Sequence, residues 1–216
     1  MKRKILISLF FLIFSTLILS YCHHSILNID LLQINEASKT LTKSQIDQIL
    51  TPESNNEYLN LITISLSILI KVILISIIIF TGSILFEKKI SIKNIFFIVI
   101  KLEYIFLVTV LFEIIYFKFV NTTASLNEIQ YFYPLSALNI VGYQSVESWF
   151  IYPLQVLNLF ELAYWLLLSY FVGKLAFTEK DNGKPMDLGF KIVASSYGSA
   201  LLLWVVVVMF FTLNYS

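Results

Sequence analysis

Charged residues, cysteine and histidine are all scarce in this 216-residue chain. Only 13% of its residues are charged, whereas about a quarter are charged in a typical soluble protein. With 58% hydrophobic residues and a mean hydropathy of +0.82, the chain has too few charged groups to cover a water-facing surface. A net charge of +1 also argues against a nucleic-acid partner, which requires a concentrated basic patch. We therefore expect the lipid bilayer to be its main surrounding.

The shortage of cysteine and histidine excludes several kinds of site. The single cysteine, Cys22, rules out an intramolecular disulfide and any metal site built from several thiolates. His23 and His24 adjoin it, but three adjacent residues on a loop rarely converge on one metal. The chain also lacks a Gly-x-Ser-x-Gly elbow, a His-Glu-x-x-His helix and a glycine-rich phosphate loop. We therefore predict no metal, no cofactor and no catalytic residues, and we expect that the protein is not an enzyme.

Long apolar runs are the main feature that the chain does have. A hydrocarbon core of about 30 Å requires roughly 20 residues of helix. The runs predict an all-α integral membrane protein with a single polytopic domain over residues 1–216, a bundle of about five transmembrane helices. The predicted spans are 5–21, 62–86, 95–119, 153–172 and 192–213. The first follows three basic residues, so an uncleaved signal-anchor helix and a removed signal peptide are both possible there.

Lysine and arginine gather beside alternate ends of these runs. Ten of the fifteen flank the N-terminus and the connections 87–94 and 173–191. The other side, with loops 22–58 and 120–148, has three basic residues against seven acidic ones. The positive-inside rule then predicts a multi-pass protein of the cell (inner or plasma) membrane with its N-terminus cytoplasmic and its C-terminus outside. In span number and orientation, though in no sequence motif, the chain resembles Yip1-type membrane proteins.

Two short elements are predicted outside the spans. The segment 133–140 is repeated at 152–159 with five of eight positions identical. Each copy has a proline in second place, which fits the first turn of a helix. We expect the first copy to form a short interfacial or re-entrant helix near 134–141, and the second to continue through the bilayer. A capping box at 42–45 predicts a small amphipathic helix near 43–50.

Polar residues form a stripe along the predicted fourth span. Gln155, Asn158 and Glu161, followed by Trp165 and Ser169, fall within about 120° of helical arc. Amides and carboxylates are costly in lipid, so this stripe should face protein or water. It either makes hydrogen bonds between helices or lines a path for a small molecule or proton, with Glu161 as the ionisable centre.

Two further residues are candidates for the same polar path. Asn139 occupies the matching position in the first repeat copy, where it would lie at the outer entrance. Lys71 lies near the middle of its own apolar run, at a depth that allows a pair with Glu161. The alternative for Lys71 is that its long side chain extends to the headgroups.

The last span carries small residues that favour close helix packing, among them Ala194, Ser195, Gly198 and Ser199. They predict tight packing on a neighbouring helix, self-association, or contact with other membrane subunits. We therefore expect a scaffold, assembly or accessory subunit of a membrane complex. The alternative is a small permease, or a permease subunit, that uses the polar stripe of the fourth span. A third class is a membrane enzyme that acts through Glu161.

Overall fold

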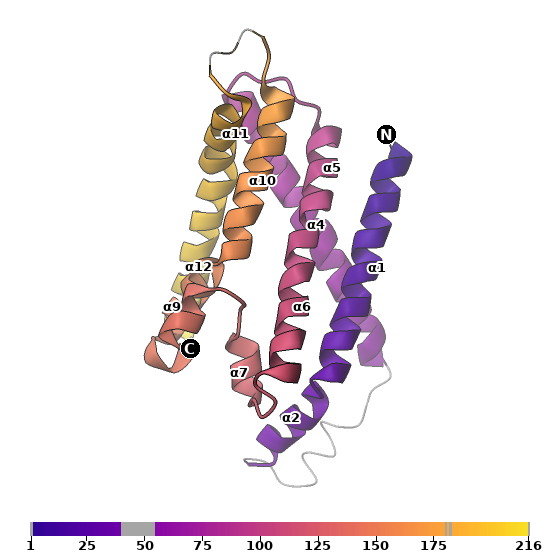
Figure 1. Ribbon diagram of the computed structural model, residues 1–216, viewed down its shortest axis with the longest axis vertical. Helices are drawn as coiled ribbons and strands as arrows, with labels where there is room; N and C mark the ends of the chain where they lie inside the picture. Colours follow the sequence, from indigo (N-terminus) through magenta and orange to yellow (C-terminus); the bar gives the residue numbers. More distant parts are fainter. Residues whose placement is uncertain (1, 40–54, 180, 182, 216) are drawn as a thin grey trace.

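The computed structural model describes residues 2–39, 55–179, 181 and 183–215, and all regular structure in these residues is helical (Figure 1). Five stretches are long and apolar enough to cross a membrane, which confirms that sequence prediction as far as length and composition go. They are Lys2–Ile26, Leu59–Leu85, Ile92–Phe119, Leu159–Ala176 and Pro185–Tyr215. The helix predicted near 43–50 lies outside the described residues.

The helices of the first three apolar stretches are α1 (Lys2–Ile26), α4 (Asn55–Leu85), and α5 (Ile92–Leu102) followed by α6 (Tyr104–Phe119). The fourth stretch is α10 (Leu159–Ala176), and the fifth joins α11 (Pro185–Val193), a π-helical turn η2 (Ala194–Gly198) and α12 (Ser199–Tyr215). Short helices complete the chain: α2 (Ile29–Ala37), α7 (Leu126–Tyr131), α8 (Ala137–Val141), the 3₁₀ turn η1 (Tyr143–Ser145) and α9 (Ser148–Val156). The short helix predicted near 134–141 is therefore present as α8.

The two ends of the bundle differ in charge. The N-terminus and the connections α4–α5 and α10–α11 lie at one end, which we call the basic end (Figure 1). The C-terminus, α2, α7 and α9 lie toward the other end, the acidic end. At the basic end, Lys88 forms an ion pair with Asp181, which also accepts hydrogen bonds from the backbone and hydroxyl of Thr178. The lysine bond first, and then those from Thr178, lower the pKa of Asp181 to about 2, so this carboxylate stays ionised and ties the two connections together.

Helices α10 and α11 pack closely through two glycines. A Cβ atom on Gly189 would lie 1.9 Å from the carbonyl oxygen of Ser169, and one on Gly173 would lie 2.0 Å from that of Pro185. Only glycine permits this approach, as in other close helix pairs of membranes. Because α10 continues to Ala176 and α11 resumes at Pro185, the predicted cytoplasmic connection 173–191 is wrong at both ends.

The core lies mainly in the basic half of the bundle. It joins α4, α5, α10 and α11 and takes one fully buried residue, Leu12, from α1. In the acidic half, α12 has no buried residue, and none of residues 59–71 of α4 is buried. A second, small cluster there joins the α1–α2 turn, α6, the α6–α7 connection and α7 through Leu27, Phe117, Ala124 and Ile129. The bundle is therefore tightly packed in its basic half and loosely packed in its acidic half.

Candidate functional site

The predicted fourth span is interrupted. Pro153 does not begin a helix as predicted but lies inside α9, and the chain leaves helical geometry at Leu157 before α10 begins. The proline lacks the N–H that would bond to the carbonyl of Trp149. Pro134 does not begin a helix either, because α8 starts at Ala137 behind the N-cap Ser136. The polar stripe therefore does not lie on one continuous helix.

The two repeat copies meet at this break. Ala137 donates its backbone N–H to the carbonyl of Leu157 at 2.9 Å, and Leu159 donates to that of Leu135 at 3.2 Å. These bonds make an isolated antiparallel bridge between Ser136 and Asn158. Unpaired backbone groups are costly in a bilayer. The first copy thus supplies the hydrogen bonds that the interrupted helix has lost.

Asn158 is the N-cap of α10 and uses its whole amide within the protein. Its Oδ1 accepts from the backbone N–H of Glu161 at 2.8 Å, and its Nδ2 donates to the carbonyls of Gln155 and Val156 at 2.8 and 3.0 Å. The residue is only 5% exposed. Gln155 likewise donates to the carbonyl of Tyr131 at 3.1 Å. Both amides therefore bond to backbone groups around the break.

Glu161 lies between α10 and the π-helical turn. Its Oε1 accepts from the indole N–H of Trp165 at 3.0 Å and from the hydroxyl of Tyr197 at 2.8 Å. Tyr197 belongs to η2, and its neighbour Gly198 lets the Trp165 ring lie so close that a Cβ there would be 2.5 Å from it. Single π-helical turns often occur at functional sites. Here the turn accompanies the contact between Tyr197 and the carboxylate.

Lys71 pairs with Glu103 and not with Glu161, so the pair with Glu161 that its depth allowed is not formed. The two side-chain atoms Nζ and Oε2 lie 2.8 Å apart, and the ammonium also lies 3.9 Å from the centre of the Phe106 ring. Tyr164 donates its hydroxyl to the other oxygen of Glu103 at 3.4 Å, and its ring contacts Tyr197 at 5.6 Å. One polar cluster thus connects α4, the α5–α6 junction, α10 and η2. We call it the mid-span cluster: Lys71, Glu103, Glu161, Tyr164 and Tyr197.

This cluster lies near the middle of the apolar helices. Lys71, Glu103, Tyr164 and Tyr197 are 11 to 14 residues from the basic ends of their stretches, or about 17–21 Å at 1.5 Å per residue. Glu103 is buried where α5 ends and α6 begins, and it was not among the candidate residues named from the sequence. The position of Glu103 deep within an apolar run is the sequence feature that marks it as a candidate. Sequence alone does not show that Lys71 reaches it from another helix.

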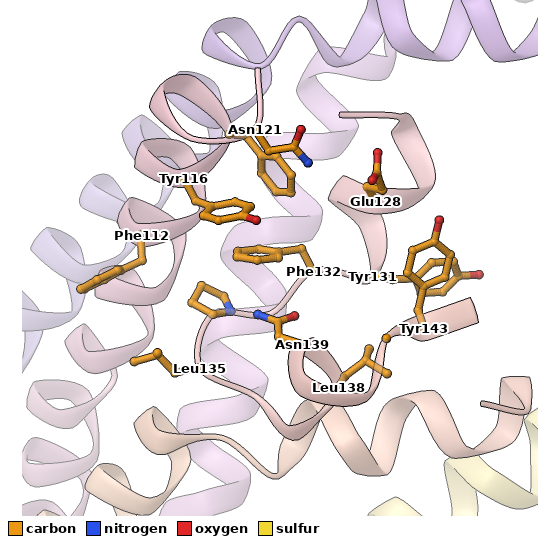
Figure 2. A pocket seen from close by; sticks show the side chains of 13 residues that line it. Phe112, Tyr116, Asn121, Glu128, Tyr131, Phe132, Leu135, Leu138, Asn139 and Tyr143 are labelled. Carbon is orange, nitrogen blue, oxygen red and sulfur yellow. The ribbon is translucent and has the colours of Figure 1, made fainter. Parts of the chain in front are cut away.

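Asn139 remains apart from the cluster. It donates to the carbonyl of Tyr133 at 2.7 Å and lies in the wall of a cavity of about 430 Å³ between α6, α7 and α8 (Figure 2). Its proposed role at the entrance of a path through Asn158 therefore finds no support in the contacts. This cavity could not be predicted from the sequence, because it forms between segments that are separate in the chain.

Each of the two histidines lies beside a different carboxylate, so the pair does not converge on one site. His23 Nε2 is 3.1 Å from Glu113 Oε1 on α6, and His24 Nε2 is 3.4 Å from Asp30 Oδ1. In the described part of the chain, no three residues of the His, Cys, Asp and Glu types are grouped so that they could hold a metal ion. The His23–Glu113 contact instead joins α1 to α6.

In its described residues the protein is thus helical, with five stretches long and apolar enough to cross a membrane, an internal polar cluster and a separate aromatic cavity. Comparison with known proteins finds no matching family model, no similar curated protein and no similar solved structure.

Proposed function

We propose that this chain is a multi-pass protein of the cell membrane, with its N-terminus in the cytoplasm and its C-terminus outside, and that it is a non-catalytic scaffold or accessory subunit of a membrane complex. The five apolar stretches support membrane insertion, and the concentration of lysine and arginine at the basic end supports this orientation.

The exposure of Lys71 is the observation that carries the proposal. Its side chain is 44% exposed although it lies in mid-span, whereas its partner Glu103 is only 7% exposed. An ammonium group at this depth normally faces protein or water, because contact with hydrocarbon is expensive. The described residues of this chain leave the Lys71 side chain partly uncovered. We therefore infer that another protein covers it in the membrane.

The residues near Lys71 on α4 indicate which kind of partner would contact it. Asn60, Thr63, Ser67 and Lys71 are all exposed, and at 100° per residue they lie within about 80° on one face of α4. We call these four residues the α4 stripe. Hydroxyl and amide groups favour helix association in membranes through hydrogen bonds between helices. We propose that the α4 stripe receives a transmembrane helix of a partner that carries polar side chains.

The hydrogen bonds made by the internal amides favour the scaffold function over a transport path. Gln155 and Asn158 are hydrogen-bonded to backbone groups beside the helix break. Glu161 accepts two side-chain hydrogen bonds. Of the five residues proposed for a path, only Lys71 has an exposed charged side chain, and its ammonium is paired with Glu103.

Photo-crosslinking in intact membranes tests the proposal. A photoreactive amino acid at position 67 should give a discrete protein adduct, because Ser67 lies in the centre of the α4 stripe. The matched control is position 62, since Ile62 is 61% exposed in the same half of α4 but on the opposite face. Position 195 tests the small-residue face, where Ser195 and Ser199 are exposed while Gly198 is buried against Trp165.

The outcomes of crosslinking separate the proposals. An adduct at position 67 but not at 62 supports the α4 stripe as the partner site. An adduct only at 195, with the mass of two chains, would instead support self-association through the exposed residues Ser195 and Ser199. Lipid adducts alone at all three positions would contradict the scaffold proposal.

A small permease is the second candidate, and the interrupted fourth span favours it. Broken helices beside a re-entrant segment are typical of transporter binding sites. Ser169 offers a clean probe, because it is fully buried and its hydroxyl has no hydrogen-bond partner among the described residues. Ser169→Cys in a Cys22→Ser background should react with a water-soluble thiol reagent if a path opens to this depth. Complete protection, with Leu157→Cys as an exposed reactive control, would contradict the permease.

A further inference from the structure

The cavity between α6, α7 and α8 is independent of both the mid-span cluster and the α4 stripe. Its volume of about 430 Å³ falls within the range of about 300–1,000 Å³ that small-molecule sites occupy. Aromatic rings form much of its wall, among them Phe112, Phe132, Tyr131 and Tyr143. Tyr131 and Tyr143 stack on each other with ring centroids 5.0 Å apart.

The cavity has an apolar side and a polar side. Phe112 and Leu135 lie at one side and are 49% and 54% exposed, whereas Glu128 lies at the other side beside Tyr131 and Tyr143 (Figure 2). Asn121 follows the end of α6, and Phe112 lies nine residues earlier in the chain, about 13 Å deeper along the helix. With the acidic end outside, the cavity extends from the headgroup level into the outer hydrocarbon layer.

Glu128 gives the cavity its charge. It is the only charged residue among the described residues that line the wall. Its Oε2 accepts from the backbone and hydroxyl of Ser125 at 2.7 and 3.0 Å in a capping box, which fixes the carboxylate in place. A carboxylate beside tyrosine rings favours an organic cation, because both the charge and the ring faces attract it.

We propose that this cavity binds an amphiphile with an ammonium headgroup. The ammonium lies between Glu128 and the tyrosine pair, and the hydrocarbon tail leaves past Phe112 and Leu135 into the bilayer. A phospholipid with a choline or ethanolamine headgroup and a free long-chain amine share this chemistry. The proposal does not depend on the scaffold function, since no residue of the α4 stripe takes part.

Binding to the purified full chain in a neutral maltoside detergent tests it. The probes are octyltrimethylammonium, octylphosphocholine, tail-less tetramethylammonium and octyl sulfonate, each titrated by calorimetry. Octyltrimethylammonium should bind at least tenfold more tightly than tetramethylammonium or octyl sulfonate. Octylphosphocholine within tenfold of it indicates a lipid headgroup as the natural source, and much weaker binding indicates a free amine.

Glu128→Gln is the decisive variant, because glutamine keeps the capping box while removing the charge. It should weaken octyltrimethylammonium binding at least tenfold with an unchanged melting temperature. Tyr143→Leu should weaken it several-fold, and Glu147→Gln, which alters an exposed carboxylate that does not line the cavity, should leave it unchanged. Equal binding by the Glu128→Gln variant, or equal binding of the sulfonate, would overturn the proposal.

Discussion

At the residue scale, Glu103 and Glu161 have different surroundings although both lie among apolar helices. Glu103 has a cationic partner, Lys71, and a weak contact from Tyr164. Glu161 has two neutral donors, Trp165 and Tyr197. A buried carboxylate that loses its only cation is left uncompensated, whereas one held by neutral donors loses a single hydrogen bond at a time. The Lys71–Glu103 pair should therefore be the more sensitive to mutation.

Lys71→Met should lower the free energy of unfolding by about 1–3 kcal/mol. This is less than the roughly 3–5 kcal/mol expected when a fully buried pair loses one partner, because the lysine is half exposed and partly screened. Adding Glu103→Leu should restore most of the loss, since no unpaired charge then remains. Denaturant unfolding in detergent measures the free energy of unfolding of the single variant and of the double variant. Adding Glu161→Gln instead should restore nothing, and a recovery there would contradict the observed pairing.

At the element scale, the interruption between α9 and α10 is held by backbone and side-chain bonds together. The bridge joins Leu157 and Leu159 to the first repeat copy, and Asn158 completes the cap. The repeat therefore does more than mark two similar helix starts. Its two copies are partners, since one supplies the hydrogen bonds that the other needs at its break.

Asn158→Ala should destabilise the protein by about 1–2 kcal/mol, because it removes a helix cap and two bonds to buried carbonyls. Asn158→Ser should cost less, since a serine hydroxyl caps well but can donate only one of those two bonds. In detergent, the melting temperature should be highest for the wild type, lower for Asn158→Ser and lowest for Asn158→Ala. Equal stability of the alanine variant and the wild type would show that the cap is dispensable.

A second feature at the element scale is the close contact of α10 and α11 at Gly173 and Gly189. Gly189→Ala and Gly173→Ala should each cost about 1–3 kcal/mol or more, because the added methyl meets backbone atoms at 1.9 and 2.0 Å. Gly82→Ala is the matched comparison, since its methyl would lie 2.6 Å from the Ser196 side chain and 3.3 Å from the nearest backbone atom, so its clash is milder. Melting temperatures should fall less for Gly82→Ala than for the other two. The reverse order would contradict the helix contact described above.

At the scale of the whole molecule, packing is uneven along the bundle axis. The main core lies in the basic half. In the acidic half, a small cluster and the bridge at the break help to connect the short helices. Local opening occurs where few apolar contacts oppose it. The acidic half is thus the part of the molecule best suited to admit a partner helix or an amphiphile.

Hydrogen exchange should reveal this difference. In detergent, amides of α7 and α8 should exchange at least a hundredfold faster than those of α10 and α11 around Gly173 and Gly189, which corresponds to an opening free energy lower by about 2.7 kcal/mol. Mass spectrometry of peptides from the exchanged protein measures both regions at once. Uniform protection would show that the two halves open together.

The five apolar helices and the basic end could be predicted from the order of residues alone, because length, hydropathy and lysine placement are properties of the linear chain. It placed Gln155, Asn158 and Glu161 on a polar stripe, and each is indeed hydrogen-bonded within the protein. Tertiary structure alone decided which groups meet. Lys71 pairs with Glu103, the helix break pairs with residues 20 to 24 positions earlier, and a cavity forms beside Glu128. All three depend on distances between separate segments, and helical periodicity contains no information about those distances.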